Sequence, residues 1–225
     1  DAFGTLTFSG HGGSSAQSAV DDMASGDIWD NGFGATGAPT SSTSNNMIGY
    51  ALPSLMDGLS ANISFVPQTG SSTQYASTMD WAVAYTGVEG LSIAYGIADI
   101  ETGAAASDGD QTVMSASYAY GPVTVAYSNS DYDTGAANTE ALKQEVSSYA
   151  VSYTVSDSIS LTYGSETVES GLAGSIDAEY EKLSASYTAG GMTISAKMID
   201  AENVNHGTGA TEDGEYWSLG LAFAF

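Results

Sequence analysis

The side chains that could carry out acid–base or nucleophilic chemistry are few and scattered in this sequence. His11 and His206 stand apart in polar, loop-like stretches, and no set of serine, histidine and aspartate predicts a catalytic triad. The glycine-rich run 10–13 lacks the strand–loop–helix context of a phosphate-binding loop. Cysteine is absent, which excludes disulfides and thiolate metal sites. We therefore expect no enzymatic activity and no dedicated cofactor.

Carboxylates dominate the charged side chains. The 225 residues include 27 acids against three lysines, which gives a formal net charge of −24. Such a chain cannot neutralise phosphates, so nucleic acid is excluded as a partner. The excess of acids produces a negative potential that favours cations, although acidity also serves solubility or a salty habitat. Acids near residues 99–110 and 202–215 could bind calcium weakly, but they lack the ligand spacing of a dedicated site.

The segment 10–45 is the longest stretch without a strand pattern. It carries four aspartates among apolar residues, serine and glycine: Asp21, Asp22, Asp27 and Asp30. Residues 15–24 could form a short helix. A loop of about 35 residues is uncommon unless it is functional or disordered, and its apolar side chains argue against disorder. We therefore predict a functional, acidic loop.

Alternation of large apolar residues with small or polar ones predicts strands through most of the chain. It is clearest in the predicted strand 215–225, where Trp217, Leu219, Leu221 and Phe223 share one face. The other predicted strands are 2–9, 46–53, 59–67, 77–86, 91–99, 111–120, 122–131, 145–155, 158–168, 177–188 and 191–200. Most have close to the roughly 9–11 residues that cross a bilayer at a tilt. Short turns alternate with longer polar connections, as in outer-membrane barrels.

One tyrosine recurs just before the short turn of each of four predicted hairpins: Tyr85, Tyr118, Tyr153 and Tyr187. These tyrosines share the parity of the large apolar residues, so they face outward together. A ring of tyrosines at one level is typical of the aromatic girdle at a membrane interface. The alternative is that ordinary hairpin tyrosines pack across the strands of a soluble sheet.

The opposite face of these hairpins consists mostly of alanine, serine and threonine, including Ser152, Thr162, Ser184 and Ser195. A soluble sandwich would place its large aliphatic residues inside and its polar residues outside. Here the consistent arrangement puts large side chains against hydrocarbon and hydroxyls against water. We therefore predict an all-β, antiparallel transmembrane β-barrel of about twelve strands, with residues 1–225 as a single domain.

The sequence also resembles a known family. AFGTLTFSG at residues 2–10, the long acidic loop, the many hairpins and a last strand ending in Phe225 resemble the general diffusion porins of Gram-negative bacteria, most closely those of alphaproteobacteria. The resemblance implies an outer-membrane location, passive diffusion, contact with lipid and lipopolysaccharide, and homotrimers. It further implies that Tyr216, Leu221, Phe223 and Phe225 form the signal read by the barrel-assembly machinery.

In that family the long loop folds inward, narrows the pore and faces a basic wall. The arginines of that wall have no counterpart here, and Lys182 and Lys197 are the remaining candidates. They have inward parity and lie about equally far from the turn 189–191, so antiparallel pairing makes them near neighbours. Two adjacent ammonium groups repel unless acids face them, and the four aspartates of segment 10–45 would supply those acids. The alternative is two solvated lysines near a rim.

The strand count departs from the family pattern. Family members usually have about 16 strands, and their inward loop follows the fifth, whereas here it follows the first. The chain is therefore the C-terminal portion of a porin, needs another polypeptide to close its wall, or forms a smaller barrel of its own. All edges must be paired in lipid.

These observations lead to one functional expectation and two alternatives. We expect an outer-membrane porin that passes small hydrophilic solutes with a preference for cations. The alternatives are a structural or adhesive extracellular β protein that polymerises through unpaired edges, and an enzyme built on an outer-membrane barrel.

Overall fold

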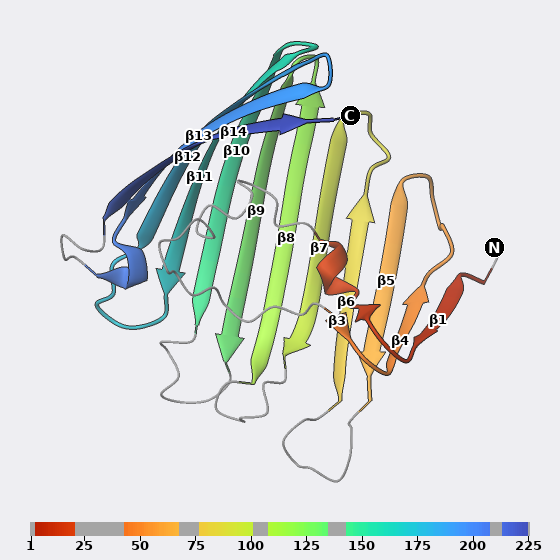
Figure 1. The fold of residues 1–225 in the computed structure, drawn as a ribbon. Helices are drawn as coiled ribbons and strands as arrows, with labels where there is room; N and C mark the ends of the chain where they lie inside the picture. The colour runs from red at the N-terminus through yellow and green to blue at the C-terminus, as the bar shows by residue number, and fades with distance from the viewer. Residues whose placement is uncertain are drawn as a thin grey trace.

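The computed structural model describes residues 3–20, 43–67, 77–100, 108–134, 143–207 and 213–224. Its main element is a strongly curved antiparallel sheet of twelve strands (Figure 1). The strands are β1 Thr5–Ser9, β4 Met47–Ala51, β5 Leu59–Val66, β6 Thr78–Tyr85, β7 Leu91–Ile100, β8 Gly109–Tyr120, β9 Val123–Thr134, β10 Gln144–Ser156, β11 Ile159–Ser170, β12 Ala178–Ala189, β13 Met192–Glu202 and β14 Gly214–Phe223. The predicted all-β, antiparallel fold is confirmed.

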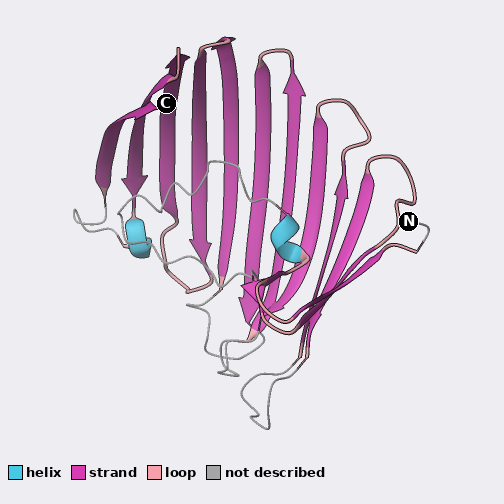
Figure 2. Ribbon diagram, turned by 45° about the vertical axis from the view of Figure 1, so that its right-hand side comes forward, coloured by secondary structure: helices cyan, strands magenta, loops and turns pink. Residues whose placement is uncertain are grey.

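The strands follow one another across the sheet in sequence order, from β1 to β14. Short turns join them at one end, hereafter the short-turn end, and longer connections join them at the other, the long-connection end (Figures 1 and 2). Among the described residues β1 and β14 pair with one neighbour each and not with one another. Since hydrocarbon leaves an unpaired backbone group unsatisfied, both of these edges need a partner in a bilayer.

The central strands extend further toward the long-connection end than the sequence pattern predicts. β9 continues to Thr134 and β11 to Ser170, whereas predicted strands end at residues 131 and 168. The outward side chains there are carboxylates such as Asp133 and Glu169, so the apolar alternation ends before the backbone pairing does. At the N-terminal edge, in contrast, β1 begins at Thr5 rather than at residue 2.

Glycine sets the geometry of the short turns. Gly90, which precedes β7, has a φ of +76°, and a Cβ there would collide with the carbonyl oxygen of Ala119 in the neighbouring hairpin. The Ala119 amide also donates a hydrogen bond of 2.8 Å to the Gly90 carbonyl oxygen. Only glycine combines this left-handed conformation with such close approach at little cost. The turn therefore holds β7 and β8 in register.

The convex outer face of the sheet is apolar and exposed. Trp217 is 76% exposed, and Leu219, Leu221 and Phe223 follow it along the same face of β14. Trp81 and Tyr153 on other strands are also partly exposed rather than packed in an interior. A soluble protein rarely exposes an apolar patch that continues across a whole sheet. This face is therefore suited to contact with acyl chains.

The concave inner face differs between its two halves, contrary to the expectation of a uniformly small and polar lining. Toward the short-turn end it carries half-exposed hydroxyl side chains. Toward the long-connection end it carries large residues that are buried: Val113, Tyr132, Val146, Val168, Tyr180 and Ile199. Val113 belongs to a cluster with Ala16 and Val20 beside the 3₁₀ turn η1, Gln17–Ala19. Val146, Val168, Tyr180 and Ile199 belong to a cluster with Val204 of the 3₁₀ turn η4, Val204–His206, whereas Tyr132 packs with Ala98 of the sheet itself. The lining is thus packed at one end and open at the other.

Two 3₁₀ turns lie over the concave face (Figures 1 and 2). η1, Gln17–Ala19, packs on β6 and β7, and η4, Val204–His206, packs on β12. In the described part of the predicted helix at 15–24 the structure holds the turn η1, and residues 21–24 lie outside the described residues. The two-residue strands β2, Gly13–Ser14, and β3, Thr43–Ser44, pair with each other in antiparallel orientation, so the two ends of the segment between them lie side by side. Segment 10–45 thus contains a short ribbon that the sequence pattern missed.

Among the described residues, no helix is long and apolar enough to span a membrane.

The two-sided character of the sheet predicts a difference between neighbouring positions on β10. Val151 is outward and exposed, and Ser152 is inward and half-buried. We expect Val151→Lys to lower the free energy of unfolding in lipid vesicles by about 2–4 kcal/mol, because it places an ammonium group in hydrocarbon. Ser152→Lys, its matched control, should cost much less. Urea titration followed by tryptophan fluorescence measures both, and equal losses would contradict the assignment of the faces.

Candidate pore-lining site

Hydroxyl groups from neighbouring strands pair across the open half of the inner face. Ser152 and Thr162 lie 2.9 Å apart, and Ser160 and Ser186 lie 2.7 Å apart. Near the next short turn, the hydroxyls of Thr188 and Thr193 lie 3.0 Å apart. These groups form a hydroxyl ladder across β10, β11, β12 and β13. Each pair shares one proton and leaves further capacity for hydrogen bonds to water or solute.

Lys182 and Lys197 extend from this wall on adjacent strands. Lys182 is paired with Ile199 and Lys197 with Ser184, so the two lysines are diagonal neighbours on the inner face of β12 and β13. The ammonium of Lys197 lies 5.5 Å from the ring centroid of Tyr216 on β14, a cation–π contact that orients it. The structure thus brings together the two lysines that the sequence places on one face.

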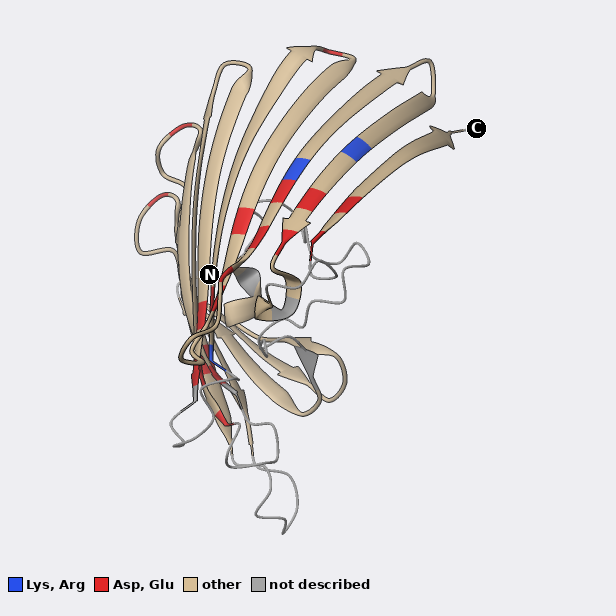
Figure 3. Ribbon diagram, turned by 90° about the vertical axis from the view of Figure 1, so that its left-hand side faces the viewer, with Lys and Arg blue, Asp and Glu red and all other residues tan. Residues whose placement is uncertain are grey.

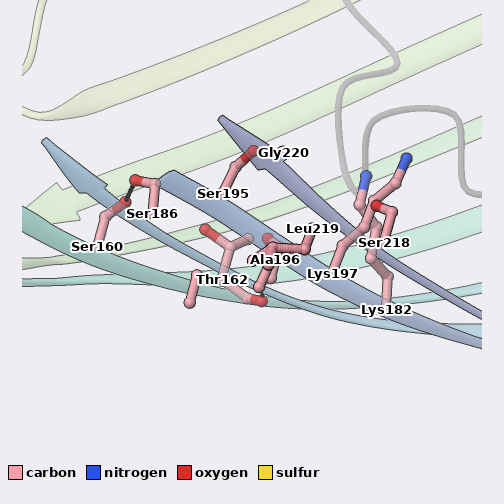
Figure 4. Close-up of a pocket in the computed structure, with 12 residues that line it drawn as sticks. Ser160, Thr162, Lys182, Ser186, Ser195, Ala196, Lys197, Ser218, Leu219 and Gly220 are labelled. Atoms are coloured by element: carbon pink, nitrogen blue, oxygen red, sulfur yellow. Dashed lines mark hydrogen bonds between the residues drawn. The ribbon is translucent and has the colours of Figure 1, made fainter. Parts of the chain in front are cut away.

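The lysines border a recess of about 440 Å³ in the wall. Its polar lining consists of Ser160, Thr162, Lys182, Ser184, Ser186, Ser195, Lys197 and Ser218. None of the described residues that line it is acidic. Figure 4 shows the two ammonium groups side by side at one end of this lysine recess, with the hydroxyls spread along the rest. Sequence reasoning identified the lysines and most of the hydroxyls but not the concavity that joins them.

The third lysine is used elsewhere. Lys143 lies at the long-connection end, where its ammonium is 2.8 Å from a carboxylate oxygen of Asp133. Because this pair is partly exposed, it contributes little to stability. Lys143 offers a charge-matched comparison with the lysines of the recess.

Most of the strand carboxylates lie toward the long-connection end (Figure 3). Their parity along the strands places them on the outer face, a distribution that sequence reasoning missed. Glu181, Asp200 and Glu215 oppose one another directly across β12, β13 and β14. Asp131, Glu145 and Glu169 do the same across β9, β10 and β11. The parity of these acids in the sequence was the available signal. Such rows of like charge belong where the wall leaves hydrocarbon, because opposed carboxylates repel unless water and ions screen them.

Two carboxylates of the described strands face inward, and both are buried. Glu166 accepts a hydrogen bond of 2.6 Å from the hydroxyl of Ser148, and Asp80 accepts a longer one of 3.4 Å from the hydroxyl of Ser64. Both lie in the packed half of the inner face. They therefore contribute less to the electrostatic potential of the open lumen than two exposed carboxylates would.

The start of segment 10–45 is fixed to the inner wall. The Ala16 amide donates a hydrogen bond of 2.8 Å to the Ser64 hydroxyl, and Ala16 and Val20 pack on Ala82 and Ala94. Gly96 makes room for this contact, because a Cβ there would lie 2.9 Å from a methyl carbon of Val20. The segment therefore enters over the concave face. The predicted constriction aspartates Asp21, Asp22, Asp27 and Asp30 lie outside the described residues.

The four predicted girdle tyrosines are on the outer face near the short turns. Tyr118, Tyr153 and Tyr187 are each more than two-fifths exposed, and Tyr85 is half-buried. Further aromatic contacts that were not predicted lie closer to the middle of the wall: Trp81 with Tyr95 at 5.7 Å, and Tyr127 with Tyr149 at 4.9 Å between ring centroids.

The structure describes only some of the residues in the other predicted sites. Leu221 and Phe223 of the predicted assembly signal face outward, Tyr216 faces inward, and Phe225 lies outside the described residues. The described part of the chain holds no group of three or more histidines, aspartates and glutamates placed to bind a metal ion. Glu101 and Glu212 of the two predicted acidic groups are not among the described residues. Weak calcium binding at the acidic loops stays a prediction.

An apolar convex face, a concave face with one open, hydroxyl-lined half, and strands that mostly have bilayer-spanning length define the wall of a transmembrane β-barrel channel. The family comparison agrees with this class. A family model described as Gram-negative porin matches residues 1–182, so the chain belongs to the Gram-negative porin family. The protein is therefore a porin of the bacterial outer membrane. Its relation to the alphaproteobacterial type stays a prediction. Among curated proteins, no significant match was found.

Solved porin structures share this fold at low sequence identity. OmpF of Salmonella typhi in complex with daunomycin superposes with a TM-score of 0.68 at 14% identity, covering 98% of this chain and 74% of that one. An anion-selective porin from Comamonas acidovorans gives 0.66 at 16% identity, covering 100% and 71%. A loop-deletion mutant of OmpT from Vibrio cholerae gives 0.65 at 14% identity, covering 98% and 76%. Roughly a quarter of each of those chains has no counterpart in residues 1–225.

The contact between η1 and the wall predicts how firmly segment 10–45 is anchored. In this cysteine-free chain, a single Ala16→Cys substitution would report on the contact, because Ala16 is buried. We expect slow maleimide labelling of that thiol, and faster labelling when Gly96→Leu displaces Val20. Gly49→Leu is the matched control, since a Cβ at Gly49 meets nothing closer than 3.9 Å. Equal rates in both variants would show that η1 does not rest on Gly96.

Proposed function

We propose that this porin conducts small hydrophilic solutes passively and prefers cations. The observation that carries the proposal is the combination of a hydroxyl-lined concave wall with a net charge of −24. An aqueous lumen with a negative potential concentrates cations and repels anions. One structural neighbour is an anion-selective porin. The fold that this chain shares with that neighbour therefore does not by itself imply cation selectivity.

The acids responsible for the preference are those that reach the lumen. The inward carboxylates of the described strands are buried, and the outward rows lie on the far side of the wall. We infer that the aspartates of segment 10–45, together with acids of the connections, supply the field. Opposite them, Lys182 and Lys197 form the basic part of the constriction.

Closure and assembly complete the proposal. In a bilayer the edges of β1 and β14 must be paired, and strands outside residues 1–225, a second polypeptide, or direct pairing of the two edges would each achieve this. We propose further that the closed barrels associate as homotrimers, with lipid and lipopolysaccharide on the apolar face. We also propose that the last strand is read by the barrel-assembly machinery. The tyrosines near the short turns would form the interfacial girdle.

The selectivity proposal predicts a reversal potential. With the full-length protein in a planar bilayer under a potassium chloride gradient, we expect a reversal potential with the sign of a cation-preferring channel. The preference for cations should be weaker at high salt, because salt screens the field. Replacing Asp21, Asp22, Asp27 and Asp30 by Asn should reduce the preference. The outward triple variant Glu181→Gln, Asp200→Gln and Glu215→Gln should leave it nearly unchanged. An anion-preferring channel, or a larger effect of the outward variant, would refute the assignment.

The basic wall predicts a change of the opposite sign. Replacing both Lys182 and Lys197 by Gln should increase the preference for cations in the same recordings, because two positive charges leave the lumen. No change would show that the two lysines are solvated groups without influence on permeation. If the protein gave no conductance at all, water-soluble filaments would indicate the adhesive alternative, and hydrolysis of ester or peptide substrates would indicate an enzyme.

A further inference from the structure

The outer face of the sheet carries a cavity that the pore does not use. It has a volume of about 210 Å³ and lies across β11, β12, β13 and β14. Seven of its ten lining residues have outward parity, and they form two parallel rows across the strands. Lys182 also borders this outer cavity, but its side chain is directed to the inner face (Figure 4). We propose that the outer cavity binds membrane lipids with a cationic, ammonium-bearing headgroup. The proposal rests on the proposed contact of the outer face with lipid and does not depend on conduction.

The first row consists of three carboxylates. Glu181 is paired with Asp200, and Asp200 with Glu215, so the acids stand at directly opposed positions on β12, β13 and β14. All three residues are exposed, and no ion pair within the described residues neutralises them. The Tyr163 hydroxyl donates a hydrogen bond of 2.9 Å to Glu181, which orients that carboxylate. Because opposed carboxylates repel one another, a cation that enters between them is stabilised.

The second row is apolar and ends in an indole ring. Leu183 is paired with Met198, and Met198 with Trp217, each two positions nearer the short-turn end than the acid on its strand. These three residues are 53%, 64% and 76% exposed, so the row is open to acyl chains. Leu219 and Leu221 continue the apolar surface along β14 toward the short-turn end. An alkyl chain can therefore lie along the wall while its polar end meets the carboxylates.

An indole ring beside carboxylates favours an organic ammonium group over other charged groups. The face of a tryptophan is the best aromatic partner for an ammonium, and it also packs against methylene groups. A divalent metal ion instead needs several oxygens that converge on one point. The described part of the chain holds no group of three or more histidines, aspartates and glutamates placed in that way. Since the acid row also repels an anionic headgroup, the occupant is a lipid whose headgroup has a net positive charge.

The experiment uses Trp217 as the reporter of its own surroundings. In the full-length protein, Trp29→Phe with Trp81→Phe keeps Trp217 as the one tryptophan of residues 1–225. The protein is reconstituted into dioleoylphosphatidylcholine vesicles in which a minor fraction of lipid has brominated acyl chains, which quench a neighbouring indole. That lipid has a trimethylammonium, a phosphocholine or a phosphoglycerol headgroup. We expect the trimethylammonium lipid to quench Trp217 about threefold more strongly than the phosphocholine lipid, because several weak contacts act together. The phosphoglycerol lipid should quench least.

A second tryptophan serves as the positional control. Trp29→Phe with Trp217→Phe leaves Trp81, which is also on the outer face and has Ile63 and Ile97 as its opposed neighbours. Trp81 should be quenched about equally by the trimethylammonium and phosphocholine lipids, because no row of acids lies beside it. The same headgroup preference at both tryptophans would overturn the proposal, since it would show attraction to the whole protein rather than to the outer cavity.

The acid rows supply a pair of charge-matched variants. In the Trp217 reporter, the triple variant Glu181→Gln, Asp200→Asn and Glu215→Gln should abolish the headgroup preference. The control triple variant removes the same charge from the acid row of β9, β10 and β11 and should leave the preference unchanged: Asp131→Asn, Glu145→Gln and Glu169→Gln. A preference that survives the first variant, or that falls equally in the second, would overturn the proposal. Stronger quenching by the phosphoglycerol lipid that appears with calcium and disappears with EDTA would also overturn it, because that result indicates a metal-bridged phosphate.

This readout separates the outer cavity from the proposed function, because quenching requires no conductance. A headgroup preference at Trp217 in a protein that conducts no ions would uphold the outer cavity while refuting the channel. Conductance with cation preference, but equal quenching by the three headgroups, would refute the outer cavity alone. Retention of the heat-modifiable mobility typical of folded barrels shows that each variant is folded.

Discussion

The pairing of every backbone amide and carbonyl within hydrocarbon is the constraint on which this structure depends. A bilayer offers no substitute partner, so a polar-rich chain can cross it only as strands that pair with strands. The meander from β1 to β14 meets this demand for all strands except at its two outer edges, because each strand pairs with its neighbour in the order β1, β4, β5 and onward to β14. Once the backbone is paired in this way, side chains must alternate between two faces, and each face adapts to a different solvent.

The inner face shows how the same alternation serves two purposes along one strand. On β12, Tyr180 is buried in a cluster beneath η4, whereas Ser184 and Ser186, one and two repeats beyond Lys182, line the open recess. Where η1 and η4 lie on the sheet, the lining includes small apolar clusters, whereas around the recess near the short-turn end it is rich in hydroxyls. The change between the two falls near the lysines.

Much of this arrangement could be predicted from the sequence because the period of two is a local property. The parity of Val151 and Ser152 assigns them to opposite faces, and counting from the turn at 189–191 places Lys182 near Lys197. The ends of the strands could not be predicted in the same way. Beyond Asp131 both faces become polar or mixed, so the apolar alternation disappears while the backbone still pairs to Thr134.

Burial on the inner face also lay beyond the sequence pattern. Parity directs Tyr132 and Tyr180 inward, but their burial depends on contacts with residues distant in the sequence, and periodicity contains no such information. The concavity between Ser160 and Gly220 has the same origin, since it arises from the combined shape of four strands. The constriction aspartates, on segment 10–45, are a prediction that rests on composition and resemblance alone.

The distribution of charge separates the overall field of the protein from the local chemistry of its wall. A net charge of −24 suggests a uniformly negative channel, yet the carboxylates of the described strands are either buried, as Glu166 is, or arranged on the outer face, as Asp200 is. The described lining of the lysine recess, in contrast, holds Lys182 and Lys197 and no carboxylate. The net charge of the sequence therefore does not describe the wall, because the charge that a solute meets depends on which face of the sheet each side chain occupies.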